Sequence, residues 1–149
     1  MTNKQVERAQ TFAHLHVPGK PLVLFNVWDA GSAIAVAKAG AAAIATGSWS
    51  VAAAHGVDDG EALTLADVIA NAARIVRAVD LPATIDFEAG YGASPDEVGN
   101  SVTALLATGA VGVNIEDRFI DRAGLQSISD QALRLSAARR AAETAGVPL

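Results

Sequence analysis

The feature that most constrains the fold of this chain is a regular alternation between short apolar runs and longer amphipathic segments. The apolar runs, which are predicted strands, cover residues 22–27, 41–47, 83–88 and 111–117. Helical patterns follow at residues 29–40, 64–79, 94–109 and 129–145. A chain that alternates strands with helices forms a parallel sheet joined by right-handed crossovers. The sequence therefore predicts an α/β fold of about four strand–helix units.

Start signals support two of the predicted helices. Thr64 can cap the helix that follows it, with Asp67 at the third helical position, and Ser94 stands directly before Pro95. A serine or threonine cap and a proline in the first turn are both typical of helix starts. These signals fix where two of the strand–helix connections end.

The rest of the chain completes a single predicted domain over residues 1–149. A further helix is expected at residues 3–15, inside an N-terminal segment that covers residues 1–20. The strand–helix units then fill residues 21–149, and residues 48–62 are predicted as a loop with about one helical turn. A chain of 149 residues is long enough for one domain with a real core.

Charge and composition exclude several classes of function. The formal net charge is -5, which argues against a nucleic-acid partner, because such proteins present a basic face. There is no cysteine, so disulfides, thiolate metal sites and a cysteine nucleophile are excluded. No apolar stretch reaches transmembrane length, and the N-terminus mixes acids with bases, unlike a signal peptide. We expect a soluble cytoplasmic protein with no membrane partner.

Two architectures suit the alternation: a doubly wound open sheet and a (β/α)8 TIM barrel. Acidic residues follow three of the predicted strands: Asp29, Asp86 with Glu88, and Glu116 with Asp117. Active groups gathered at the carboxyl ends of many strands are typical of the barrel, whereas an open sheet uses mainly one crevice. No strand–helix turn carries a dinucleotide-binding or P-loop pattern. We favour the TIM-barrel type. A full barrel takes about 250 residues, so this chain is expected to supply a half-barrel or a fragment.

The stretch "TIDFEAGYG" (residues 84–92) holds the candidate metal ligands. Residues two apart on a strand point the same way, so Asp86 and Glu88 are expected to face one pocket. A divalent cation such as Mg²⁺ would offset their repulsion, and Glu116 on the next strand could be a third acid at that cation. The alternative is that these acids cap helices or pair with arginines such as Arg118. Spacing alone leaves both interpretations open.

Other stretches give weaker signals. In "ATGSWS", the small residues Gly47 and Ser48 expose backbone N–H groups that can cradle a carboxylate or phosphate, but a plain turn that buries Trp49 explains them as well. The acids of residues 58–62 and the charges of "ALRLSAARRAAE" are interpreted as solvated. The three histidines show no ligand spacing.

Taken together, "FNVWDAGSAIAVAKAGAAAIATGSWSVAAAHGVDDGE", "DLPATIDFEAGYG" and "GAVGVNIED" resemble the isocitrate lyase / phosphoenolpyruvate mutase family, in its PEP-mutase-like branch. The resemblance covers about residues 20–145. It implies a TIM-barrel enzyme that binds Mg²⁺ or Mn²⁺ and makes or breaks a C–C or P–C bond next to a 2-oxo acid. It also implies a small carboxylate substrate and a homo-oligomer.

The resemblance assigns a role to each candidate site residue. Asp86 matches the direct metal ligand, and Glu88 and Glu116 match acids that hold metal-bound water. Asp59 matches an acid that reaches the metal shell from the second loop, so Asp59 and Glu116 are the candidate catalytic acids. A substrate cradle is implied for the backbone of Gly47, Ser48 and Trp49.

Departures from the family narrow the expected activity. Isocitrate and methylisocitrate lyases carry a "KKCGH" loop after the fourth strand, where this chain reads "EDRFIDRAGLQSISD". That loop also lacks the asparagine pattern of true phosphoenolpyruvate mutases. The substrate-binding arginine of the family's fifth strand would lie beyond Leu149. The expected function is a Mg²⁺-dependent lyase acting next to a 2-oxo or 2-hydroxy carboxylate. The alternatives are oxaloacetate decarboxylation, phosphonopyruvate-type chemistry, and a non-catalytic half-barrel that binds metal or another chain.

Overall fold

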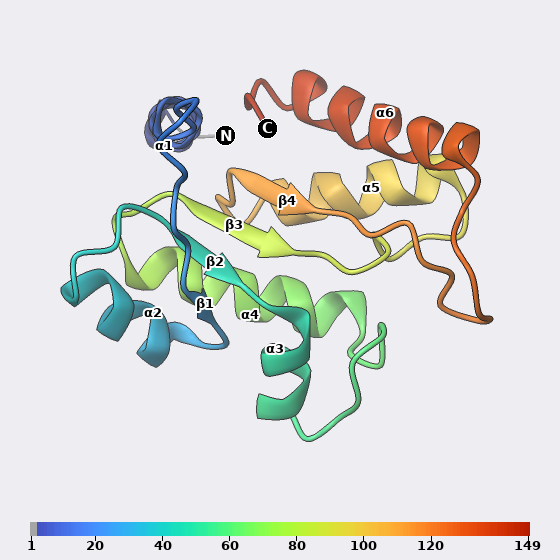
Figure 1. Cartoon of the computed structure of the whole chain (residues 1–149), viewed down its shortest axis with the longest axis horizontal. Helices are drawn as coiled ribbons and strands as arrows, with labels where there is room; N and C mark the ends of the chain where they lie inside the picture. Colours follow the sequence, from blue (N-terminus) through green and yellow to red (C-terminus); the bar gives the residue numbers. More distant parts are fainter. Residues whose placement is uncertain (1–2) are drawn as a thin grey trace.

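The four strands form one parallel sheet in the order β1-β2-β3-β4 (Figure 1). The structure, a computed structural model, describes residues 3–149. Its elements are α1 (Asn3–Leu15), β1 (Asn26–Val27), α2 (Ala30–Lys38), β2 (Ile44–Thr46), α3 (Ser48–Ala54), α4 (Leu65–Ala78), β3 (Ala83–Asp86), α5 (Pro95–Leu106), β4 (Gly112–Asn114) and α6 (Ile128–Thr144). The predicted strand–helix alternation is confirmed.

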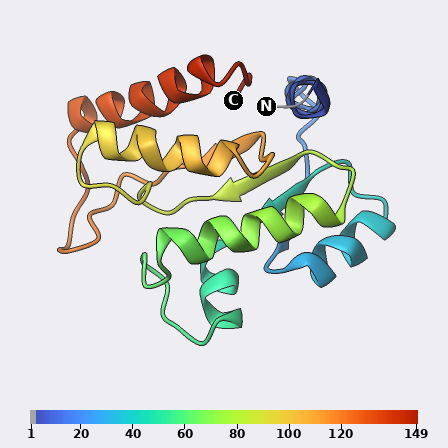
Figure 2. The same cartoon turned by 180° about the vertical axis from the view of Figure 1, so that it is seen from behind.

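The strand order distinguishes between the two architectures. A doubly wound sheet reverses its strand order at a switch point, whereas here each strand pairs with the next one along the chain. The long helices follow the same sequence, because α2 packs against α4, α4 against α5, and α5 against α6 (Figure 2). This continuous winding in one direction is that of a barrel wall.

Helix α1 stands apart from that row and contacts the N-terminal ends of the later strands. The Gln5 side chain donates to the backbone oxygens of Leu106 and Ala110, at 2.8 and 3.0 Å. Phe12 lies so close to Gly112 and Thr84 that a Cβ on Gly112 would stand 2.9 Å from its ring. Both ends of the described chain thus lie near one another, with the C-terminus beside α1 (Figure 1).

The core lies between the sheet and the row of helices. Its largest fully buried side chains come from β2, from β3 and its end, and from the helices α4 and α5: Phe87, Ile44, Ile75, Ile85, Leu105 and Leu106. Among residues 3–149, no helix is both long and apolar enough to cross a membrane.

Side-chain caps begin the helices where the sequence indicated. The Thr64 hydroxyl accepts from the Asp67 amide, and Ser94 and Glu97 cap each other's backbone reciprocally, with Pro95 in the first turn. Asp29 caps α2 in the same way with Ser32. Asp29 is therefore a capping acid, as the plainer interpretation of the strand-end acids proposed.

All four predicted strands are longer than the observed ones. The predicted strands 41–47 and 111–117 shrink to residues 44–46 and 112–114, because only these residues form regular strand pairs with their neighbours. Only residues 26–27 of the predicted strand 22–27 are paired, and Val23 and Phe25 are 67% and 62% exposed. β1 is the first strand of the sheet, and no described neighbour pairs with its outer side. The loop at residues 48–62 contains a seven-residue helix, α3, rather than one turn. The third strand ends at Asp86, not at residue 88, because the backbone of Glu88 turns left-handed at φ 47°.

Candidate metal and substrate site

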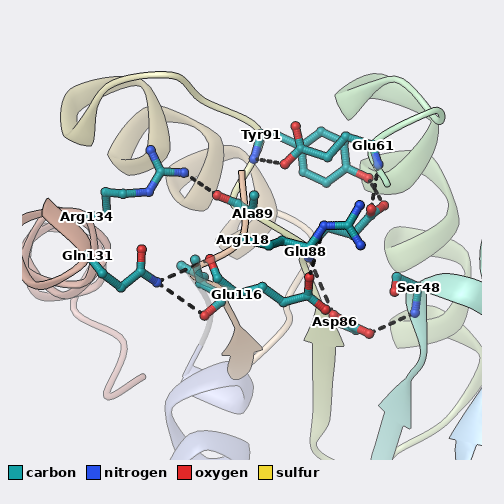
Figure 3. A network of polar contacts seen from close by, with 11 residues as sticks. Ser48, Glu61, Asp86, Glu88, Ala89, Tyr91, Glu116, Arg118, Gln131 and Arg134 are labelled. Atoms are coloured by element: carbon teal, nitrogen blue, oxygen red, sulfur yellow. Dashed lines mark hydrogen bonds and ion pairs between the residues drawn. The ribbon is translucent and has the colours of Figure 1, made fainter. Parts of the chain in front are cut away.

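Acidic side chains gather at the carboxyl ends of β3 and β4 (Figure 3). Asp86 is the last residue of β3, and Glu116 follows β4. The two strands stay paired beyond their ends, since the Glu116 amide donates to the Glu88 backbone oxygen at 2.6 Å. Asp59 and Glu61 come from the loop between α3 and α4. The fold therefore brings together acids that are far apart in the sequence.

A side chain of β2 and a backbone amide of α3 orient Asp86. Its Oδ2 accepts from the Ser48 amide at 2.9 Å, and its own amide donates to the Thr46 hydroxyl at 2.9 Å. The carboxylate is half-buried and lies at the C-terminal edge of the sheet. One oxygen is thus fixed by the first residue of α3, which holds the carboxylate in a defined direction.

Glu88 belongs to a closed ring of three residues. Only 5% of Glu88 is exposed, and its carboxylate accepts from the Tyr91 hydroxyl at 2.8 Å and from the Glu61 amide. The Tyr91 amide in turn donates to the Glu61 carboxylate at 2.9 Å. A buried carboxylate needs such donors, because desolvation of a charge is costly.

The expected common orientation of Asp86 and Glu88 has a different basis from the one predicted. Strand alternation does not apply, since Glu88 lies beyond the strand in a left-handed conformation. Both side chains nevertheless line one small cavity of about 10 Å³, together with Ser48 and Tyr91. That volume is about what one water needs.

Glu116 lies in a field of other acids. Burial raises its pKa above the ordinary value, and the negative charges of Asp86, Asp59 and Glu88 raise it further. Arg118 opposes this, with its Nε 3.7 Å from Glu116 Oε2. The acids at this rim are therefore close enough to repel one another, and one cationic side chain offsets them in part.

Burial also raises the pKa of two residues in this hydrogen-bonded ring of three, Glu61 and Tyr91. It raises the pKa of Glu61, and the charge of Glu88 adds to the shift. Burial and the hydrogen bond to Glu88 raise the pKa of the Tyr91 hydroxyl well above its usual range. Tyr91 therefore remains a proton donor to Glu88 at any physiological pH.

The predicted substrate loop is only partly free. Gly47 is the N-cap of α3, and the Ser48 amide is already used by Asp86. Trp49 is 73% exposed, so the alternative of a turn that buries this side chain is wrong. Asp59 is exposed and acts on Glu116 through its charge.

A hard divalent cation fits this donor set if water molecules complete its coordination shell. Within residues 3–149 no group of three or more His, Cys, Asp or Glu side chains is arranged to hold a metal directly. Mg²⁺ commonly takes one or two carboxylates and keeps several waters. Asp86 and Glu116, with Glu88 and Asp59 nearby, supply only oxygen ligands and an excess of negative charge, as Mg²⁺ and Mn²⁺ prefer.

Sequence reasoning missed the contribution of α6 to this site. Arg134 was expected on a solvated face, yet it is only 4% exposed and donates to backbone oxygens of the loop after β3. Helical periodicity contains the signal, because residues 134, 137, 138 and 142 form one buried stripe. Glu61 and Tyr91 have no comparable signal, since their pairing depends on left-handed backbone.

Comparison with known proteins identifies the family. The sequence pattern of the phosphoenolpyruvate phosphomutase family matches residues 12–149. The chain belongs to the phosphoenolpyruvate phosphomutase family. The predicted resemblance is confirmed, and proteins that match this chain carry lyase and mutase names.

Three relatives show how far the similarity extends. A Burkholderia cenocepacia protein with a provisional phosphonomutase name is 49% identical, with a TM-score of 0.94 over 97% of this chain and 57% of its own. The 2-methylisocitrate lyase of Escherichia coli is 33% identical over 70% of this chain and 39% of its own length. A 2,3-dimethylmalate lyase, 24% identical with a TM-score of 0.82, covers 99% of this chain and 52% of its own.

These comparisons confirm the fold class of this family member. The structural relatives are TIM-barrel proteins, and the four strand–helix units of this chain match about half of each. The chain spans roughly 40 to 60% of the length of the relatives described above. What those relatives act on is not carried over to this chain by similarity alone.

Proposed function

We propose that the protein is a Mg²⁺- or Mn²⁺-dependent lyase that acts next to the 2-oxo or 2-hydroxy group of a small carboxylate. The observation that carries this proposal is the gathering of four carboxylates, Asp59, Asp86, Glu88 and Glu116, at the carboxyl rim of a parallel sheet. Membership of a family of lyases and mutases supports an enzyme of this kind.

Each acid has a distinct part in the proposed site. Asp86, oriented by Ser48, would hold the cation directly, and Glu116 and Glu88 would hold its waters. When bound, the cation supplies positive charge that polarises the 2-oxo group and stabilises negative charge as it develops. Glu116 has a raised pKa, which suits a group that exchanges a proton with the substrate, and Asp59 stands near it.

The loop after β4 argues against the activity of the Escherichia coli relative. Residues 117–127 contain no cysteine, although the resemblance implies a cysteine acid or base in methylisocitrate lyases. The substrate is therefore proposed to be a different 2-oxo or 2-hydroxy acid. Decarboxylation of oxaloacetate and cleavage of a phosphonopyruvate-type P–C bond use the same charge stabilisation and belong in the same assay panel.

Calorimetric titration with Mg²⁺, with and without oxalate, tests the proposal. Oxalate imitates a planar enolate, so we expect it to bind only when Mg²⁺ is present. Asp86→Asn should weaken Mg²⁺ binding at least about tenfold. Asp80→Asn is the matched control, because Asp80 is an exposed acid that pairs with Lys4 away from the site.

Two results would overturn the proposal. If wild-type protein shows no Mg²⁺-dependent oxalate binding, the metal site is wrong. If it binds both ligands but converts no acid in a panel of 2-oxo and 2-hydroxy carboxylates, the protein is a metal-binding module rather than a lyase.

A further inference from the structure

The guanidinium of Arg134 ends inside the loop that follows β3 (Figure 3). Its Nη1 donates to the backbone oxygens of Gly92, at 3.0 Å, and of Ala93, at 3.4 Å, and its Nη2 donates to that of Ala89. The side chain comes from the middle of α6, 41 or more residues further along the chain. One buried cation thus binds three carbonyl groups of a single short segment.

That segment has an unfavourable backbone conformation at two residues. Glu88 and Tyr91 have φ angles of 47° and 51°, in the left-handed region that side chains other than glycine rarely adopt. Such residues persist only when their surroundings hold them in place. Gly92 has no room for a side chain, since a Cβ there would stand 2.6 Å from the Val98 amide nitrogen.

Other hydrogen bonds hold different groups of the segment, including those from the Glu116 amide to the Glu88 oxygen and from the Ala93 amide to the Glu97 carboxylate. The Gly90 amide donates to the Phe87 oxygen at 2.8 Å, and the Ser101 hydroxyl donates to the Tyr91 oxygen at 2.7 Å. The backbone oxygens of residues 89, 92 and 93 all accept hydrogen bonds from Arg134. The fork of a guanidinium can bind several oxygens at once, which an ammonium group cannot do in the same geometry.

We propose that Arg134 is a positioning residue that fixes the backbone of residues 88–93, including its left-handed positions, and thereby holds the Glu88 carboxylate in place beside Asp86. A neighbouring residue on α6 makes similar contacts with the segment after β4, which carries Glu116. Gln131 donates to the backbone oxygens of Ile115 and Glu116, at 3.5 and 3.3 Å. Helix α6 therefore contacts both strand ends that carry the acids.

The inference rests on the proposed function only in treating Glu88 as an acid of the metal site. Its structural part is tested without metal, by hydrogen exchange of the backbone amides of residues 87–93. Arg134→Met should accelerate that exchange at least about tenfold, while exchange in the β2 strand changes little. Arg134→Lys keeps the charge and tests the fork, and it should give an intermediate acceleration.

Metal affinity is the second measurement. If Arg134 positions a metal-site acid, Arg134→Lys should weaken Mg²⁺ binding about 10- to 100-fold, as is typical when a residue that orients a ligand is changed. Arg140→Lys is the matched control, because Arg140 is an exposed arginine on the same helix. It should leave both exchange and affinity unchanged.

The outcomes separate this inference from the proposed function. Exchange at residues 87–93 that is the same in Arg134→Lys, Arg134→Met and wild type overturns the positioning role, whatever the metal does. Faster exchange with unchanged Mg²⁺ affinity overturns the link to the metal site. Absence of Mg²⁺ binding by the wild type counts against the proposed function, and loop exchange then still decides the role of Arg134. If Arg134→Met does not fold, Arg134→Lys carries the test.

Discussion

At the scale of single residues, the raised pKa of Glu61 predicts how the stability of the protein depends on pH. Its pKa is raised by burial, so the folded chain binds more protons than the unfolded chain above the usual value of 4.5. The free energy of unfolding then falls as the pH rises through the raised pKa. Glu61→Gln keeps an oxygen for the Tyr91 amide and removes the charge. We expect the wild type to lose stability relative to this variant as the pH rises above 4.5, in urea unfolding followed by circular dichroism.

Glu97 provides a control of opposite sign. Backbone hydrogen bonds from Ser94 and Ala93 lower the pKa of Glu97, so its contribution is present above the usual value of 4.5 and is lost as the pH falls through the lowered pKa. The difference in the free energy of unfolding between the wild type and Glu97→Gln should therefore rise with pH, whereas the corresponding difference for Glu61→Gln falls. If both differences change with pH in the same direction, the opposite pKa shifts assigned to Glu61 and Glu97 are wrong.

The same scale shows what sequence could and could not supply. Asp86 and Glu116 were located because an acid after a buried strand is unusual and the strand ends of a parallel sheet meet at one edge. The ring of Glu61, Glu88 and Tyr91 was not predicted, because it depends on three left-handed residues that no periodicity marks. The buried position of Arg134 could have been read from the helical repeat but was masked by its charged neighbours.

At the scale of elements, the contact between β3 and β4 depends on the absence of a side chain at Gly112. A Cβ there would stand 2.7 Å from the Thr84 hydroxyl and 2.9 Å from the Phe12 ring. We expect Gly112→Ala to destabilise the protein by about 1–3 kcal/mol through overpacking. Thermal unfolding followed by circular dichroism measures the shift.

Gly99 is the matched comparison. It lies inside α5, where a Cβ would make ordinary contacts of 3.5 Å or more with Ala137. Gly99→Ala should therefore stabilise the protein by about 0.5–1 kcal/mol, because alanine loses less backbone freedom in a helix. If both alanine variants shift stability in the same direction, close packing at β4 is not what requires Gly112.

Helix boundaries were predicted better than strand boundaries, for a physical reason. Caps are local, so Ser94 with Pro95 and Thr64 with Asp67 mark the starts of α5 and α4 without reference to the rest of the fold. Strand length depends on partners. Residues 22–25 are as apolar as a strand, but no described segment pairs with them on the outer side of β1.

At the scale of the whole molecule, exposed apolar groups predict self-association. Large side chains are well exposed at both ends of the sheet order, including Phe25 at 62% before β1 and Ile128 at 92% on α6. In the described chain β4 also pairs on one side only, and an unpaired strand edge can bind another chain.

Sedimentation velocity at low and high micromolar concentration tests this. We expect a concentration-dependent oligomer that Ile128→Ser weakens, whereas Gln10→Ser, on an exposed polar position of α1, leaves it unchanged. A single monomeric species at every concentration would contradict the prediction.

The sequential strand order also has a consequence for the folding pathway. Each strand joins one already made, so the sheet can grow one strand–helix unit at a time as the chain leaves the ribosome. Helix α1 is the exception, because the carbonyl partners of Gln5 lie 101 and 105 residues downstream. Helix α1 is synthesised well before these partners, so it is expected to wait longest for its native contacts.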